Sequence, residues 1–211
     1  NRKLDCVMSV YDVEGVALAK DTGIRSIKIA SSNVNHIPLI RKVAESCLPM
    51  IIDTGRATMA EVERAVETSR CCGAQIIMLE HSPDGHPAPD RNHDLQSLRT
   101  LQNTFGLPVG FSCHASDNDA CLAAVALGAA FIEKNLSLEP DSLEQDTAFS
   151  VGIDDFETFV GRVDRAYLRM GTAWRDVATQ TGLIATSARM GLIAKIDLVA
   201  GDICDLNSVG F

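Results

Sequence analysis

The sequence lacks an uninterrupted apolar segment of the roughly 18 residues that a membrane-spanning helix needs. Its long apolar stretches, such as Ala120 to Ile132, are shorter than that and carry glycine and alanine. The sequence does not open with a positively charged segment followed by an apolar one, as a secretory leader would. We therefore expect a soluble, cytoplasmic protein with no membrane partner.

Positive charge is also scarce. The chain has 19 Lys and Arg against 28 Asp and Glu, which gives a formal net charge of −9 at pH 7. Nucleic-acid phosphates are held by clustered basic side chains, so we expect no nucleic-acid partner. An anionic ligand would need a small, local site.

Cysteine is present, but not in the spacing of a metal or redox motif. The cysteines are odd in number and form neither a C-x-x-C pair nor a compact framework: Cys6, Cys47, Cys71, Cys72, Cys113, Cys121 and Cys204. This pattern predicts unpaired, buried thiols in a reducing cytosol.

Short apolar runs alternate with amphipathic segments along most of the chain. The apolar runs predict buried strands at Cys6–Val10, Ile27–Ala30, Met50–Thr54, Gln75–His81, Val109–His114 and Phe131–Leu136. The amphipathic segments predict helices at Val13–Thr22, Ile37–Ser46, Met59–Cys72, Leu95–Phe105, Asn118–Leu127 and Asp154–Met170. Thr58 and Glu61 form a capping-box signal before the third helix. This alternation predicts an α/β protein with a parallel sheet covered by helices.

Two architectures contain such a sheet: an open doubly wound sheet, and a (β/α)8 barrel of which about six βα units are present. Polar residues gather where the expected strands end: Lys28 with Ser31, Asp53–Gly55, Glu80 with His81, Ser112 with His114, and Glu133 with Asn135. In a barrel these points converge on one rim, whereas an open sheet spreads them along an edge. We therefore predict a barrel, with Ser112 and His114 facing its interior.

The pattern changes near residue 171. We expect a partial barrel over residues 1–171, a linker over 172–186 and a separate extended piece over 187–211, with a turn at Ala200–Asp202.

Lys28 is the first residue whose type suggests chemistry. A lysine inside an apolar strand is costly to bury unless an anion or a carboxylate meets it. Lys28 is therefore either an edge residue that extends its amine to solvent or a functional cation.

Ser112 and His114 alternate onto one face of their strand, which leaves Cys113 on the other. Cys113 should then pack against helices, and this weakens a Cys/His nucleophile hypothesis. A lone histidine at a strand end is more often structural than a ligand.

Taken together, several strings resemble the sialic acid (N-acetylneuraminate) synthase family in order and spacing. They are Lys28–Ser31, Asp53–Gly55, Pro87–Pro89, Gly106–Ser112, Ala124–Ala129, Ile132–Lys134 and Asp146–Ser150. Ser187–Arg189, Ala194–Asp197 and Ala200–Asp202 resemble the entry to that family's antifreeze-like C-terminal domain.

The resemblance implies a (β/α)8 barrel that condenses phosphoenolpyruvate with an N-acetylated aldose, typically N-acetylmannosamine, and releases phosphate with the help of manganese or magnesium. It implies that Lys28 and Ser31 hold the phosphoenolpyruvate anion, and that Ser9 and Ser112 add hydroxyl contacts. A homodimer is also implied, because the family pairs each barrel with an antiparallel partner.

The resemblance further implies that His114 is a metal ligand and that Asp146 binds the sugar or acts as an acid or base near it. Glu133 shares a face with Asn135 and would serve as a ligand or supporting base, unless it only pairs with a neighbouring lysine. The set predicted as catalytic is Lys28, His114, Glu133 and Asp146.

This chain departs from the family at several site positions. Asn135 replaces a second metal-binding His, and Ser32-Asn33 stands where the family has Glu. Asp53 replaces a Ser, while Asp84 and His86 replace an Asn and a Tyr in the substrate-binding set. A carboxylate at position 53 would repel a phosphate, and an amide at 135 binds metal more weakly than imidazole does.

The family's first two βα units, which supply a metal-site Glu and a phosphate-binding Lys, have no counterpart in this sequence. We expect a further part of the polypeptide, or another chain, to complete the barrel. Two other readings stay open: a non-catalytic scaffold or regulatory partner, and a metal-dependent aldolase-type barrel in which Asp53 joins His114 and His81 as a ligand.

Overall fold

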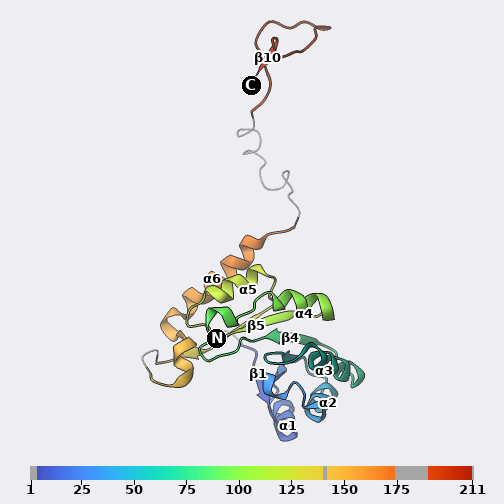
Figure 1. Cartoon of the computed structure of the whole chain (residues 1–211), viewed down its shortest axis with the longest axis vertical. Helices are drawn as coiled ribbons and strands as arrows, with labels where there is room; N and C mark the ends of the chain where they lie inside the picture. The colour runs from blue at the N-terminus through green and yellow to red at the C-terminus, as the bar shows by residue number, and fades with distance from the viewer. Residues whose placement is uncertain (1–3, 140–141, 174–189, 211) are drawn as a thin grey trace. The chain divides into compact units, whose positions relative to one another are not determined.

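The computed structural model describes residues 4–139, 142–173 and 190–210 (Figure 1). The chain forms two compact units, residues 1–170 and 171–211. The first unit contains the sheet and the helices that cover it.

The sheet has six strands, which are β1 (Val7–Val10), β2 (Ser26–Ile29), β3 (Met50–Asp53), β4 (Ile77–His81), β5 (Val109–Cys113) and β6 (Ile132–Lys134). All of them run parallel, and their order in the sheet is their order in the chain. This confirms the predicted parallel sheet. It also excludes a doubly wound topology, because no strand order reverses about a switch point.

The helices follow the strands in strict alternation. They are α1 (Val13–Asp21), α2 (Ile37–Glu45), α3 (Met59–Cys71), α4 (Ser97–Phe105), α5 (Asp119–Ala126) and α6 (Phe156–Met170). Short 3₁₀ turns lie at Ser31–Asn33, Asp90–Asn92, Gln145–Phe149 and Ile153–Asp155. The capping box at α3 is confirmed, because the Thr58 hydroxyl accepts from the Glu61 N–H while the Glu61 carboxylate accepts from the Thr58 N–H.

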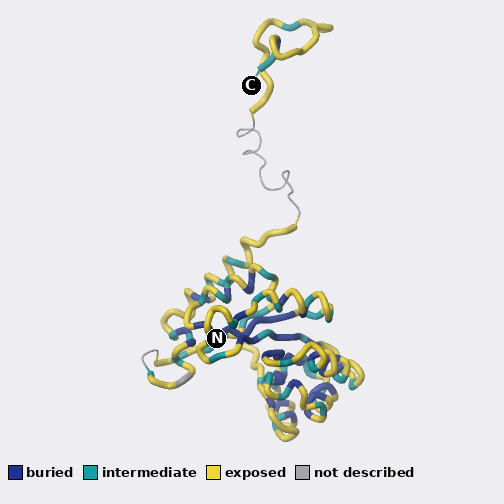
Figure 2. Tube along the Cα trace, in the orientation of Figure 1, coloured by how far each residue is buried: buried dark blue, intermediate teal, exposed yellow. Residues whose placement is uncertain are grey.

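The core lies between the sheet and the helices (Figure 2). Alternate strand residues such as Ile27, Ile29, Met50 and Phe111 pack there and are completely buried. Burying each such side chain, rather than leaving it in water, stabilises the folded chain by about 1.5–3 kcal/mol. The intervening residues therefore point to the opposite face of the sheet, where the polar strand-end residues lie.

The sixth predicted strand is shorter than expected. The run Phe131–Leu136 does not form one strand, because β6 ends at Lys134 and β7 (Leu136–Ser137) pairs instead with β8 (Val151–Gly152) in a separate parallel ladder. The carbonyl of Asn135 accepts from the Val151 N–H and anchors the change of direction. The fourth helix begins at Ser97 rather than Leu95, because Asp94 adopts a left-handed φ of 41° just before it.

The second unit contains β9 (Ile193–Ala194), paired antiparallel with β10 (Val209–Gly210). Most of the predicted linker, residues 174–186, and the first residues of the predicted tail, 187–189, lie outside the described residues. The antifreeze-like character of this piece stays a prediction.

The prediction of buried thiols is wrong for most cysteines. Cys113 and Cys121 are completely buried, Cys72 is partly buried, and the other four are exposed. The exposed thiols lie at helix ends and outside the elements, where no core is near. Cys113 does pack on the helix side of β5, as its alternation predicts.

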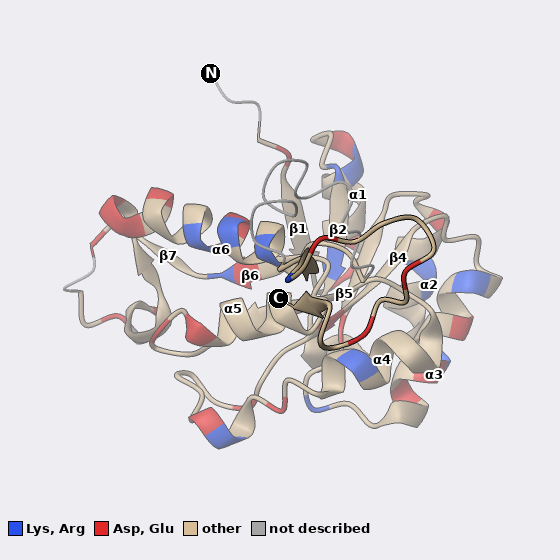
Figure 3. Ribbon diagram, turned by 90° about the horizontal axis from the view of Figure 1, so that it is seen from above, with Lys and Arg blue, Asp and Glu red and all other residues tan. Residues whose placement is uncertain are grey.

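Charged residues cover the outer surfaces of the helices. Lys and Arg residues are spread over α1, α2, α4 and α6 rather than gathered into one face (Figure 3). None of the helices in the described ranges is long and apolar enough to cross a membrane.

Candidate active site

A cavity of about 520 Å³ opens at the carboxyl ends of the strands. Every site residue predicted from the sequence lines it except Asp84: Ser9, Lys28, Ser31, Asp53, His86, Ser112, His114, Glu133, Asn135 and Asp146. Strands β1, β2, β3, β5 and β6 each contribute, so the argument from strand ends holds for their placement.

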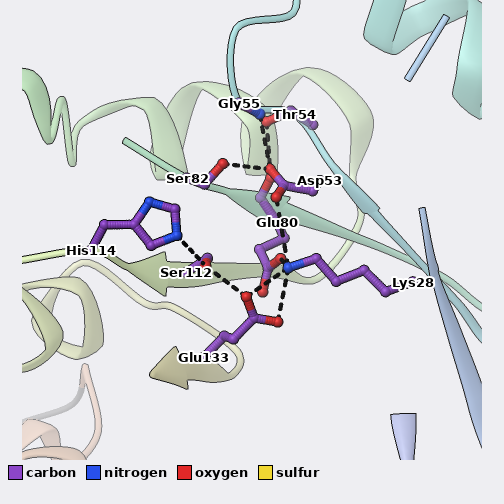
Figure 4. Close-up of polar contacts among 9 residues, drawn as sticks. All are labelled: Lys28, Asp53, Thr54, Gly55, Glu80, Ser82, Ser112, His114 and Glu133. Carbon is purple, nitrogen blue, oxygen red and sulfur yellow. Dashed lines mark hydrogen bonds and ion pairs between the residues drawn. The ribbon is translucent and has the colours of Figure 1, made fainter. Parts of the chain in front are cut away.

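Lys28 lies at the centre of a cluster of carboxylates (Figure 4). Its Nζ donates to both oxygens of Glu133 at 2.7 and 2.8 Å. It also lies 2.5 Å from Glu80 Oε2 and 3.6 Å from Asp53 Oδ2. With its side chain only 10% exposed, Lys28 is not an edge residue that extends to solvent.

The strand register explains why these groups meet. Lys28 on β2 and Glu133 on β6 point to the same face of the curled sheet and meet across it, and Asp53 on β3 stands in register with Glu80 on β4. Ser112 on β5 stands in register with Glu133, and its hydroxyl donates to Glu133 Oε1 at 2.7 Å. The carboxylate of Glu133 thus accepts from both an ammonium and a hydroxyl.

Glu80 is the main site residue that the sequence analysis did not select. Its side chain is completely buried, and neither of its oxygens accepts a hydrogen bond from a described residue, although Lys28 lies beside it. Burial raises the pKa of Glu80 to about 8, with the charge of Glu133 acting in the same direction. Glu80 is therefore mainly protonated at neutral pH.

The charge on Lys28 is maintained despite its burial. Burial alone lowers the pKa of Lys28, but the surrounding carboxylates hold that pKa above its usual value, and Glu133 and Asp53 act in this way whether or not Glu80 is ionised. With Glu80 protonated, Glu133 and Asp53 provide the negative charges that face the ammonium. The cluster then carries more negative than positive charge.

Asp53 has its own hydrogen-bond partners. Its Oδ1 accepts from the Gly55 N–H at 2.9 Å and from the Ser82 hydroxyl at 2.6 Å. Gly55 is required there, because a Cβ atom at this position would lie 2.1 Å from Ser82 Oγ. Asp53 therefore fixes the loop after β3, which explains a carboxylate that would otherwise only repel an anion.

His114 faces the same cavity from the end of β5. Its Nε2 lies 3.3 Å from the Ser112 hydroxyl, and its ring lies 4.2 Å from the His86 ring between centroids. Phe149 packs against both rings at 5.5 Å. Burial lowers the pKa of His114, and the neighbouring His86 lowers it further. The imidazole is thus neutral at neutral pH.

The side chains around His114 and Asn135 provide only part of the ligand set that a divalent metal needs. The buried Nδ1 of His114 has no hydrogen-bond partner among the described residues, as a ligand atom would. However, the Asn135 amide donates to Asp146 Oδ2 at 3.4 Å. No group of three His, Cys, Asp or Glu side chains in the described ranges is arranged to hold a metal ion. The described residues therefore do not form a metal site by themselves.

Two residues selected from the sequence, Asp84 and His81, do not line the cavity. Asp84 lies outside the cavity lining and pairs instead with Arg56, whose Nε donates to its Oδ1 at 2.8 Å. His81 points to the helix side of β4, where its Nε2 lies 2.8 Å from the His93 carbonyl and its ring lies near Phe111. Asp53, His114 and His81 therefore cannot share a metal, and the aldolase-type hypothesis loses its ligand set.

Comparison with known proteins gives consistent matches. The model of the NeuB family matches residues 1–175. The chain is 30% identical over 195 residues to N,N'-diacetyllegionaminic acid synthase of Campylobacter jejuni, covering 92% of this chain and 58% of the relative. It is 28% identical over 211 residues to pseudaminic acid synthase of the same species, covering 96% and 59%.

A solved structure agrees with the fold. The N-acetylneuraminic acid synthetase of Leptospira borgpetersenii, crystallised with citrate, superimposes with a TM-score of 0.76 at 25% identity and covers 85% of this chain and 64% of its own. The chain thus spans about three fifths of the length of the curated relatives that it matches.

Proposed function

Because the chain belongs to the NeuB family, we propose that its cavity binds phosphoenolpyruvate and an N-acetylated aldose and condenses them to a nonulosonic acid. In this reaction the enol carbon of phosphoenolpyruvate bonds to the aldehyde carbon, and water replaces the phosphate, which leaves. The observation that supports the proposal most directly is the cluster of Lys28, Ser112 and Glu133 beside His114 in one cavity.

Lys28 and Ser112 provide the donors for the carboxylate of phosphoenolpyruvate. Both now donate to the carboxylate of Glu133, whose side chain is 44% exposed and belongs to an edge strand. A substrate carboxylate has the same shape and charge as that of Glu133, so it can take over the same donors when Glu133 turns away. Glu133 then becomes a free base beside the reacting atoms.

Two further polar residues of the cavity, Asp146 and His114, are assigned to the aldose. Asp146 is exposed on the cavity wall, next to Asn135, and can accept from sugar hydroxyls. The neutral His114 can donate or accept a proton at its ring nitrogens as the aldehyde oxygen becomes a hydroxyl.

The test is direct. The protein is incubated with phosphoenolpyruvate and one of two acceptor classes, N-acetylmannosamine or a doubly N-acetylated aldose, with and without manganese. Phosphate release is followed together with the NMR signals of a new nonulosonic acid. Release that depends on the aldose supports the proposal, and its absence with every acceptor contradicts it.

One observation favours a non-catalytic role instead. The ammonium of Lys28 is already surrounded by carboxylates, which a scaffold that has lost its substrate would tolerate. A chain of this kind would not bind phosphoenolpyruvate, so calorimetric titration distinguishes the two functions before any turnover is measured.

A further inference from the structure

Arg56 is the second fixed positive charge on the cavity wall. Of the residues described there, only Lys28 and Arg56 are Lys or Arg. Lys28 is enclosed by carboxylates, whereas the side chain of Arg56 is 73% exposed and meets one carboxylate, that of Asp84. A substrate with two anionic groups needs a cation beyond Lys28, and Arg56 is the one available.

The backbone at Arg56 is held in an unusual conformation. Arg56 has a φ of 61°, the left-handed region that side chains other than glycine and asparagine rarely adopt. The preceding turn is fixed, because the Thr54 N–H and hydroxyl both donate to the Glu80 carbonyl and the Gly55 N–H donates to Asp53. The loop therefore aims Arg56 at the cavity at a conformational cost.

Asp84 accepts hydrogen bonds from only some of the N–H groups of the Arg56 guanidinium. Nε and Nη2 both donate to one oxygen of Asp84, Oδ1. The remaining N–H groups of Arg56 have no hydrogen-bond partner in the described part of the chain, and Asp84 is itself 61% exposed. A guanidinium can donate two parallel hydrogen bonds to two oxygens of one phosphate. The Asp84 contact therefore positions the Arg56 side chain while leaving N–H groups available for a ligand.

We propose that Arg56 binds the phosphate group of phosphoenolpyruvate and exchanges Asp84 for it. The carboxylate end is assigned to Lys28 and Ser112, because the Glu133 carboxylate already occupies those donors. The phosphate group is then bound by Arg56, in the loop that follows β3. This inference rests on the proposed function and adds the residue that recognises the phosphate.

The experiment uses two variants that break the same ion pair. Arg56→Gln removes the guanidinium, and Asp84→Asn removes its competitor while leaving the guanidinium free. Inorganic phosphate and pyruvate are titrated calorimetrically into each variant and into the unaltered protein. Arg162→Gln, which breaks the exposed pair with Asp119 on α6 and α5, is the matched control.

We expect Arg56→Gln to weaken phosphate binding at least tenfold and Asp84→Asn to strengthen it, with pyruvate affinity and the control unchanged. If both variants weaken phosphate binding equally, the pair is only a brace between two loops and the proposal is wrong. It is also wrong if Arg56→Gln has no effect, or if the unaltered protein binds no phosphate at millimolar concentration.

Turnover separates this inference from the proposed function. Phosphate binding that depends on Arg56 without any condensation leaves the Arg56 assignment standing and overturns the synthase activity. Condensation with an unchanged KM for phosphoenolpyruvate in Arg56→Gln does the reverse.

Discussion

Replacing Glu80 by glutamine tests the charge balance of the buried cluster. Glu80 has a pKa of about 8 in the folded chain against an ordinary value of 4.5. Between these pH values the folded chain keeps a proton that the unfolded chain has released, so stability falls as the pH rises. Each pH unit costs about 1.4 kcal/mol of unfolding free energy, which amounts to roughly 2–3 kcal/mol between pH 5 and pH 7.

Glutamine has nearly the same shape and does not titrate, so Glu80→Gln should escape this loss. We expect the unfolding free energy of the variant, relative to the unaltered protein, to grow by roughly 2–3 kcal/mol from pH 5 to pH 7. With a urea m-value of about 1–3 kcal/mol/M, the midpoints should separate by roughly 1 M or more.

The assay is urea unfolding at half-unit pH steps from 5 to 8, followed by circular dichroism. Glu63→Gln on the exposed side of α3 is the control for loss of a carboxylate without burial. A constant difference between Glu80→Gln and the unaltered protein across this range would refute the reasoning, because it would mean that Glu80 is ionised throughout.

Further predictions concern binding and assembly. Lys28→Ala should weaken phosphoenolpyruvate binding about 10- to 100-fold, since a charge-assisted contact is worth about 1.5–3 kcal/mol; equal affinity in two folded proteins would make Lys28 a structural counterion. Glu133→Gln should tighten pyruvate binding by freeing Lys28 and Ser112, and weaker binding in calorimetry would show that Glu133 supports the ligand rather than competing with it. Asn135→His should raise manganese affinity in a metal titration, because imidazole is the better ligand; no change would mean that the rest of the site is not in place. The full-length protein should scatter light as a dimer, and a monomer would contradict the expected homodimer.

The sheet could be predicted because its signals are local. Each strand is a short apolar run, the helices lie in the segments between them, and α3 begins at the capping-box signal of Thr58. The convergence of polar residues followed from the parallel order alone. The break at Asn135 could not be predicted, because it depends on its carbonyl accepting from the N–H of Val151 in β8, a later segment of the chain.

The site was predicted less completely than the sheet. Glu80 and His81 both lie at a strand end, and alternation separates them without saying which one faces inward. That choice depends on the neighbouring strands, which place Glu80 beside Lys28 and His81 against Phe111. The proton on Glu80 depends on three other charged groups from three strands, which no local pattern contains.

Because some cysteines are exposed and others are completely buried, their thiols can report local opening of the fold without an introduced label. Reagents that alkylate thiols can reach the exposed Cys6, Cys47, Cys71 and Cys204 in the folded chain. Cys113 on β5 and Cys121 on α5 have no exposed surface, and the Lys134 ammonium lies 3.6 Å from the Cys113 sulfur. The rate at which Cys113 and Cys121 are alkylated therefore measures how often β5 and α5 separate.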